Sequence, residues 1–188
     1  MSSIRFGTEA NEPGRFPLSE PIIERLGSVM GDPAVSPVLD MERKKNMGQD
    51  WDLTIHTDGA SRGNPGQAGI GIVVCGPDGE VVQQIAEYLG VETNNAAEYR
   101  ALLRALEIAR TMGAMKVKFY SDSELMVKQI RGEYKVKNAN LQPLYRKAME
   151  DLRQLSHYSI EHVRREFNKD ADRLANLGID QAKTLNGR

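Results

Sequence analysis

The order of apolar runs and turn signals after Trp51 most constrains the fold of this chain. Three strand-like segments come first, and Gly- or Pro-containing loops separate them: WDLTIHTD, QAGIGIVVCG and EVVQQIAEYL. Helix-like and strand-like segments then alternate over 94–111, 115–122, 123–132, 141–155, 157–165 and 168–183. Successive strands favour antiparallel hairpins, whereas strands that alternate with helices favour parallel pairs. The sequence therefore predicts an α/β fold with a mixed sheet of five strands.

Composition changes near residue 50. Five of the eight prolines precede it, in a segment with only two aromatic residues. Helical spacing of apolar residues predicts a short helix over 20–30, and the basic run at 41–46 is more typical of a solvated linker than of a nucleic-acid contact. We expect residues 1–50 to be a loosely docked N-terminal extension and residues 51–188 to form the domain.

Bulk composition excludes few function classes. With 25 basic and 26 acidic side chains the net charge is −1, which argues neither for nor against nucleic-acid binding. The lone cysteine, Cys75, rules out an intrachain disulfide and fits a reducing compartment. No run approaches the roughly 18 apolar residues of a membrane span. We expect a cytoplasmic protein without a membrane partner.

Four acidic residues, each in a different segment, are candidate metal ligands: Asp58, Glu98, Asp122 and Asp172. Asp58 and Asp122 each end an apolar strand. If those strands are parallel neighbours, both carboxylates lie at one edge of the sheet, where α/β folds bind ligands. They would repel each other unless a cation or a shared proton intervened.

Glu98 has the strongest individual claim to a function. On a helical wheel Leu102, Ala105 and Ala109 lie within roughly 40° of it, so it shares the packing face. Burial of an ionised carboxylate is costly unless something compensates it. An ion pair with an arginine, or the field of the helix N-terminus, is the structural alternative.

Structural explanations also exist for the other three acids. Asp58 precedes a glycine and could form a turn, Asp122 could cap a helix, and Asp172 could be a first-turn charge. The three histidines are scattered and the only thiol is Cys75, so no zinc-type ligand set is present. Acids without such partners select hard cations, Mg²⁺ or its substitute Mn²⁺.

Four motifs in register resemble type 1 ribonuclease H: TDGASRGNPGQAGIG, TNNAAEYRAL, YSDSELMVKQI and HVRREFNKDADRLAN. The resemblance covers about residues 51–180. It implies a ribonuclease H-like fold, a five-stranded sheet flanked by helices, with 51–188 as the catalytic domain. It places the four acids in the family's catalytic, metal-binding positions. It also implies cleavage of the RNA strand of RNA/DNA hybrids to 5′-phosphate and 3′-hydroxyl ends.

The resemblance also implies roles for individual residues. Two metal ions about 4 Å apart would clamp the phosphodiester, with Asp58 as their bridge and Glu98 near the 2′-hydroxyl. The implied substrate-binding residues are Asn64, Thr93, Asn94, Asn95 and Ser123. Thr93 and Asn94 could equally be helix caps, and both roles are compatible.

Two departures from the family pattern bear on substrate and proton handling. The segment GEYKVKNANLQPLYRK is short and mildly basic where many relatives carry a basic protrusion. Its neighbourhood offers Lys128, Lys135 and Lys137, for which a solvated surface role is the simpler interpretation. Some relatives carry a mobile histidine in the loop before the last acid, where it helps proton transfer or product release. Here His162 lies within a strand pattern, so we expect a residue of 164–166 to occupy that loop instead.

We therefore expect a monomeric nuclease on RNA/DNA hybrids. A nuclease that also cuts double-stranded RNA, or an inactive nucleic-acid-binding module, are the alternatives.

Overall fold

The computed structural model describes residues 51–186, with side chains described through Gln181. The helix expected over 20–30, the linker at 41–46 and the N-terminal extension lie outside the described residues. The elements are β1 (Leu53–Gly63), β2 (Gly66–Cys75), β3 (Val81–Glu92), α2 (Asn94–Thr111), β4 (Lys116–Ser121), α3 (Glu124–Ile130), α4 (Gln142–Leu152), β5 (His157–His162), the 3-10 turn η1 (Arg165–Phe167) and α5 (Lys169–Asn186).

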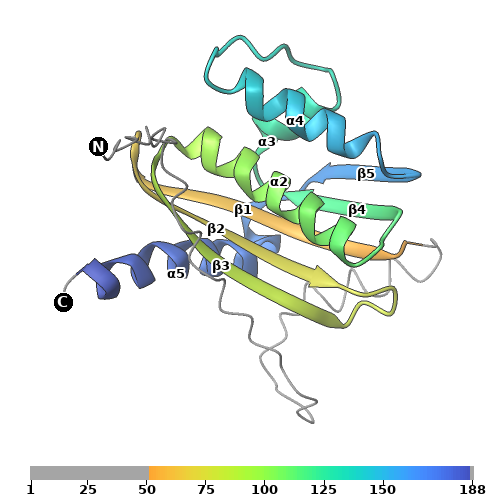
Figure 1. Cartoon of the computed structure of the whole chain (residues 1–188), viewed down its shortest axis with the longest axis horizontal. Coiled ribbons are helices and arrows are strands. Elements are labelled where there is room, and N and C mark those ends of the chain that lie inside the picture. Colours follow the sequence, from red (N-terminus) through yellow and green to blue (C-terminus); the bar gives the residue numbers. More distant parts are fainter. Residues whose placement is uncertain (1–50, 187–188) are drawn as a thin grey trace, which may run out of the picture.

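The sheet has the mixed topology that the order of segments predicts. Its strands lie in the order β3-β2-β1-β4-β5. The pairs β1–β2 and β2–β3 are antiparallel, whereas β1–β4 and β4–β5 are parallel. Strand β1 is therefore central, and its parallel partner β4 is supplied by a crossover through α2 (Figure 1).

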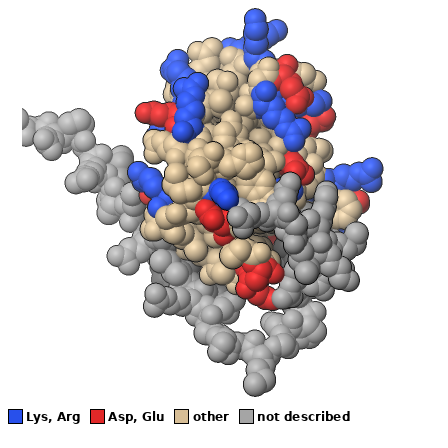
Figure 2. Space-filling view, turned by 90° about the vertical axis from the view of Figure 1, so that its right-hand side faces the viewer, with Lys and Arg blue, Asp and Glu red and all other residues tan. Residues whose placement is uncertain are grey.

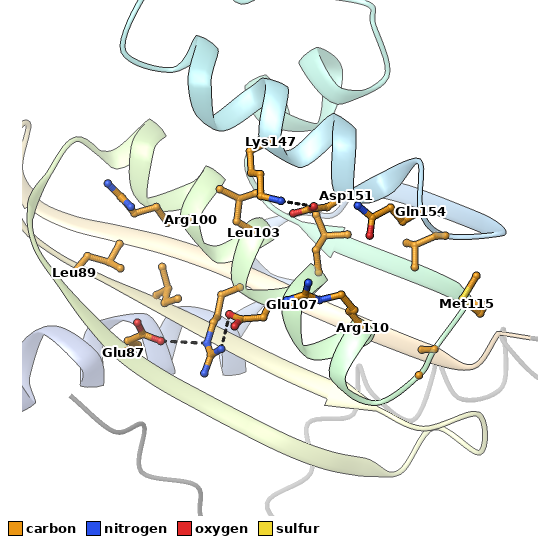
Figure 3. A pocket seen from close by; sticks show the side chains of 16 residues that line it. Glu87, Leu89, Arg100, Leu103, Glu107, Arg110, Met115, Lys147, Asp151 and Gln154 are labelled. Atoms are coloured by element: carbon orange, nitrogen blue, oxygen red, sulfur yellow. Dashed lines mark hydrogen bonds and ion pairs between the residues drawn. The ribbon is translucent and has the colours of Figure 1, made fainter. Parts of the chain in front are cut away.

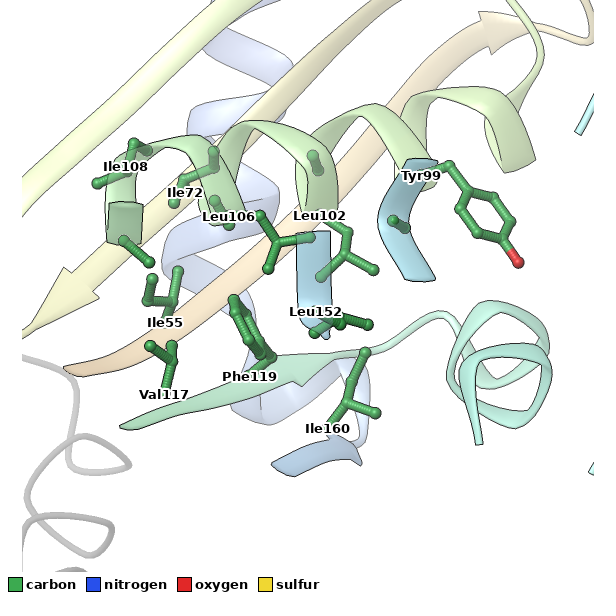
Figure 4. Packing of buried hydrophobic residues seen from close by; sticks show 14 of the residues in the cluster. Ile55, Ile72, Tyr99, Leu102, Leu106, Ile108, Val117, Phe119, Leu152 and Ile160 are labelled. Atoms are coloured by element: carbon green, nitrogen blue, oxygen red, sulfur yellow. The ribbon is translucent and has the colours of Figure 1, made fainter. Parts of the chain in front are cut away.

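Helices cover both faces of the sheet. Helices α2, α3 and α4 lie on one face and α5 lies on the other, against β1, β2 and β3 (Figure 1). The main core lies under α2, where Ile55, Phe119 and Leu102 are fully buried (Figure 4). None of the helices within 51–186 is long and apolar enough to cross a membrane.

Several local predictions hold. Asp78 and Gly79 form the turn into β3, where Gly79 has φ 82° and the Asp78 carboxylate accepts from the Glu80 N–H at 3.0 Å. Thr93 caps α2 by accepting from the Ala96 N–H at 3.2 Å, and a proline lies in the first turn of α4. Cys75 is buried in β2.

Three predicted strand ends are wrong. Strand β3 runs to Glu92, three residues beyond the predicted end at Leu89. Strand β1 does not end at Asp58 but continues to Gly63, because its glycine-rich end stays paired with β2 as far as Gly66. Strand β5 ends at His162, because Arg165–Phe167 turns into a 3-10 helix.

Two glycines let helices approach the sheet closely. A Cβ on Gly59 of β1 would lie 2.2 Å from backbone atoms of Ala97 and Glu98 in α2. A Cβ on Gly71 of β2 would lie 1.9 Å from the Ala171 carbonyl oxygen in α5. Both contacts are too short for any other residue, so these glycines set how near α2 and α5 lie to the strands.

Candidate metal centre

Three of the four predicted acids converge. Asp58, Glu98 and Asp122 each offer one carboxylate oxygen, and these oxygens all lie within 4.8 Å of one another. The parallel register pairs Thr57 with Ser121, which brings the next residues, Asp58 and Asp122, to the same edge of the sheet. Glu98 reaches them from α2, which lies against β1 at Gly59.

Burial and mutual repulsion raise the pKa of two of these acids. Burial is the largest cause that raises the pKa of Asp58, to about 8, and repulsion by Asp122 adds to it. Burial also raises the pKa of Glu98 well above its ordinary value, with repulsion from Asp58 as the next cause. An N–H bond from Gly59 opposes that shift. The cluster therefore needs either protons or a cation to offset its charge.

The residues fit a divalent metal. Glu98 Oε2 is buried and has no hydrogen-bond partner among the described residues, so a ligand is needed to satisfy it. The donors are all carboxylate oxygens, the ligand type of Mg²⁺ and Mn²⁺. The position of Glu98, at 5% exposed on the packing face of α2, is the one predicted from the helical wheel.

Asp172, the fourth predicted acid, is not part of this three-oxygen cluster. It is half-buried in the first turn of α5 and forms an ion pair with Arg165, whose Nε donates to Asp172 Oδ1 at 3.1 Å. It still lies near enough to raise the pKa of Asp58 by repulsion, whereas Arg165 lowers it. Asp172 therefore borders the cluster and is held at its rim by an arginine.

Sequence reasoning missed Asn168 and left Arg165 as one of three candidates. Asn168 is buried, and its side-chain N–H₂ donates to Asp122 Oδ1 and to the Thr57 carbonyl, both at 3.0 Å. The available signal was its place directly before the last helix, four residues ahead of Asp172. That place predicts a cap but does not reveal contacts with two strands.

The proposed substrate residues gather around the start of α2. The tip of the β1–β2 hairpin contacts this end, where the Asn94 N–H donates to Asn64 Oδ1 at 3.3 Å. Asn64, Asn94 and Asn95 are exposed, whereas the Thr93 hydroxyl caps the helix. Ser123 lies elsewhere, between Asp122 and α3, and makes no side-chain cap bond.

The histidines and lysines fall where the simpler interpretation places them. His56 is 4% exposed and stacks on Tyr120 with ring centroids 4.9 Å apart. His162 is the exposed last residue of β5. Lys128 pairs with Glu124 at 2.7 Å, and residues 131–141 join α3 to α4 without a helix. On the face in Figure 2, Lys and Arg form separate groups, not a continuous patch.

A hollow of about 530 Å³, separate from the acid cluster, lies between β3, α2 and α4 (Figure 3). None of the four acids lines it. Most of its charged side chains are paired: Arg104 with Glu107 at 2.6 Å, Lys147 with Asp151 at 2.6 Å, and Arg100 with Glu92, outside the lining, at 2.5 Å. The acid cluster, not this hollow, is therefore the candidate site.

Comparisons with known proteins give a consistent result. The model of the reverse transcriptase-like family matches residues 56–178. The chain is 42% identical over 125 residues to ribonuclease HI of Halobacterium salinarum, which covers 66% of this chain and 63% of that protein. It is 42% identical over 131 residues to a bifunctional protein of Mycobacterium tuberculosis, covering 69% of this chain and 36% of that protein. The chain thus spans less than two thirds of each of these two relatives.

One similar solved structure contains a bound nucleic acid. It is LC11-RNase H1, isolated from compost by a metagenomic approach, in complex with an RNA/DNA hybrid. The TM-score is 0.66 with 41% identity, and the match covers 69% of this chain and 98% of that one.

Proposed function

The chain belongs to the reverse transcriptase-like family and carries a ribonuclease H-type domain, and from that premise we propose that it is an endonuclease on the RNA strand of RNA/DNA hybrids. The convergence of Asp58, Glu98 and Asp122 carries this proposal. The hybrid bound to LC11-RNase H1 supports the substrate class. In this proposal residues 51–188 form the catalytic domain and act as a monomer; the acids of the cluster all come from one chain, so no second copy is needed to complete it.

Two divalent cations, Mg²⁺ or Mn²⁺, fit the proposed site. When bound they lower the pKa of the attacking water and stabilise the leaving 3′ oxygen, which yields 5′-phosphate and 3′-hydroxyl products. Asp58, on the central strand β1, would share the cations with Glu98 and Asp122, whose carboxylate oxygens lie within 4.8 Å of its own. Asp172 completes the ligand set from the rim. A bound cation would offset the burial and repulsion that raise the pKa of Asp58 and Glu98, and would favour their ionised forms.

The groups around the start of α2 orient the substrate. Exposed amides of Asn64, Asn94 and Asn95 gather at the N-terminus of α2, and amide donors of this kind suit phosphate and sugar oxygens. Ser123 adds a hydroxyl beside Asp122. Glu98 also accepts from the 2′-hydroxyl next to the scissile phosphate, which selects RNA over DNA.

Cleavage of a labelled RNA/DNA hybrid with Mg²⁺ or Mn²⁺ tests the proposal, with duplex RNA and duplex DNA in parallel. We expect the hybrid to be cut and the DNA duplex to be left intact, and Asp58→Asn to remove the activity. Asp151→Asn, on α4 and paired with Lys147, is the matched control and keeps it. Binding without cleavage, or full activity in Asp58→Asn, contradicts the proposal. Cleavage of duplex RNA widens the substrate class.

A further inference from the structure

Asn168 lies at the junction that joins the last helix to the acid cluster. It follows η1 directly and precedes Lys169, the first residue of α5. It is only 2% exposed, whereas the preceding residue, Phe167, is 39% exposed. In an otherwise exposed turn, this one polar side chain points into the protein.

Asn168 forms hydrogen bonds with two of the proposed metal ligands and with the residue that precedes a third. Its side-chain N–H₂ donates to Asp122 Oδ1 and to the carbonyl of Thr57, the residue before Asp58, each at 3.0 Å. Its backbone carbonyl accepts from the Asp172 N–H at 3.0 Å. One residue therefore ties the first turn of α5 to both central parallel strands, across separations of 46 and 111 residues.

At position 168 the amide combines two properties that aspartate, arginine and lysine do not: it is neutral, and it donates two hydrogen bonds from one nitrogen. It carries two N–H donors on one nitrogen, so it can bond a carboxylate and a carbonyl together. It is neutral, so it does not add repulsion as an aspartate would. It also does not occupy the place of a cation, as an arginine or lysine would. Its bond to Asp122 Oδ1 fixes the direction of that carboxylate.

Stability alone does not explain this residue. Asn168 Oδ1 is buried and has no hydrogen-bond partner among the described residues, which is unfavourable for folding. An apolar side chain of the same size would avoid this unpaired acceptor. The two bonds that its N–H₂ group donates, to Asp122 and to Thr57, offset this cost.

We propose that Asn168 is a positioning residue of the acid site. It orients the Asp122 carboxylate and anchors α5 so that Asp172 borders the cluster formed by Asp58, Glu98 and Asp122. This inference rests on the proposed function, and its test includes metal binding without nucleic acid, so that the two can fail separately.

The test uses full-length protein with Asn168→Leu, which keeps the branched shape of the side chain and removes both donors. Asn176→Ala is the matched control, because the Asn176 amide on α5 donates to the Asp172 carbonyl at 2.9 Å but bonds no acid side chain of the cluster. Mn²⁺ affinity is measured by calorimetry without substrate, and kcat and KM are measured on the hybrid. Circular dichroism checks that each variant is folded.

We expect Asn168→Leu to weaken Mn²⁺ binding about tenfold and to lower kcat by about 10- to 100-fold, as loss of groups that orient metal ligands does elsewhere. KM should change little, and Asn176→Ala should match the wild type in both measurements. Wild-type Mn²⁺ affinity in Asn168→Leu, or an equal loss in Asn176→Ala, overturns the inference. If the leucine variant does not fold, Asn168→Ser replaces it, with the same expectations. If the wild type binds Mn²⁺ but cuts no hybrid, the proposed function fails and the metal-affinity comparison still decides the role of Asn168.

Discussion

At the scale of single residues, the raised pKa of Asp58 links the stability of the protein to pH. In the folded, metal-free protein this pKa is about 8, against 3.8 for an ordinary aspartate. Below pH about 4 the carboxyl is protonated in both states, so this contribution to stability is fully present. As pH rises through about 8 the unfolded chain has already ionised, and the contribution is lost.

We therefore predict that the free energy of unfolding of the metal-free protein falls between pH about 4 and about 8. Urea unfolding in a chelator, at intervals across this range, measures the slope. Asp58→Asn should flatten the slope without abolishing it, because the pKa of Glu98 is raised as well. A wild-type stability that rises steadily to pH 8 would contradict the prediction.

The charge of Arg165 makes a second prediction about pH. Its guanidinium lowers the pKa of both Asp58 and Glu98, although this effect is smaller than those of burial and of the neighbouring carboxylates. In Arg165→Gln the two acids hold their protons more tightly, so the acid limb of the pH profile of kcat/KM moves to higher pH. At pH 7 we expect a loss below about tenfold, since one pKa unit corresponds to tenfold.

Its neighbour Arg164 provides the control for that experiment. Arg164 is 80% exposed and lies 3.7 Å from Glu166, so Arg164→Gln should leave the profile unchanged. Arg165→Lys keeps the charge and should stay close to the wild type. Superimposable profiles for Arg165→Gln and Arg164→Gln would rule out this electrostatic effect.

At the scale of secondary-structure elements, the close packing of α5 against β2 sets a steric limit. Gly71→Ala would place a Cβ 1.9 Å from the Ala171 carbonyl, so the helix or the strand must move. We expect the free energy of unfolding to fall by about 1–3 kcal/mol or more, and the Tm to fall by at least roughly 2–4 °C. Thermal unfolding followed by circular dichroism measures it.

Gly76→Ala is the control, because the nearest atom to its Cβ would be the Asp78 carboxylate, at 3.1 Å, which can move, and its other neighbours lie at 3.5 Å or more. A Gly71→Ala variant as stable as Gly76→Ala would show that α5 is free to shift. Because α5 carries Asp172, the displaced helix in Gly71→Ala should also lower activity.

Elements also show how far the sequence determines the site. Helical periodicity, a local property, placed Glu98 on the packing face, and apolar runs placed Asp58 and Asp122 in or beside strands. That the three acids meet in one site came from the family resemblance, because local patterns do not determine which strands are neighbours. The bonds of Asn168 to Thr57 and Asp122 did not follow, because they join segments that only the folded sheet brings together. The full length of β1 was missed for a related reason, since its glycine-rich end is extended only through pairing with β2.

At the scale of the whole molecule, every residue assigned to the site lies within the described part of the chain, 51–186. We predict that a chain starting at Asp50 cleaves the hybrid with kcat/KM within about threefold of the full-length protein, because the backbone bonds of the site lie within the domain. Parallel kinetics on the two proteins measure this. A large loss would show that residues 1–50 contribute to substrate binding.

The bonds between Asn168 and the two central strands also have a consequence for the protein during its synthesis. A ribosome completes Asp122 46 residues before it reaches Asn168, roughly 2–9 s at common elongation rates. During that interval the nascent chain already contains Asp58, Glu98 and Asp122 but lacks both Asn168, the positioning residue, and Asp172, the last proposed ligand. We therefore expect the proposed nuclease activity to be absent until the final helix has been translated.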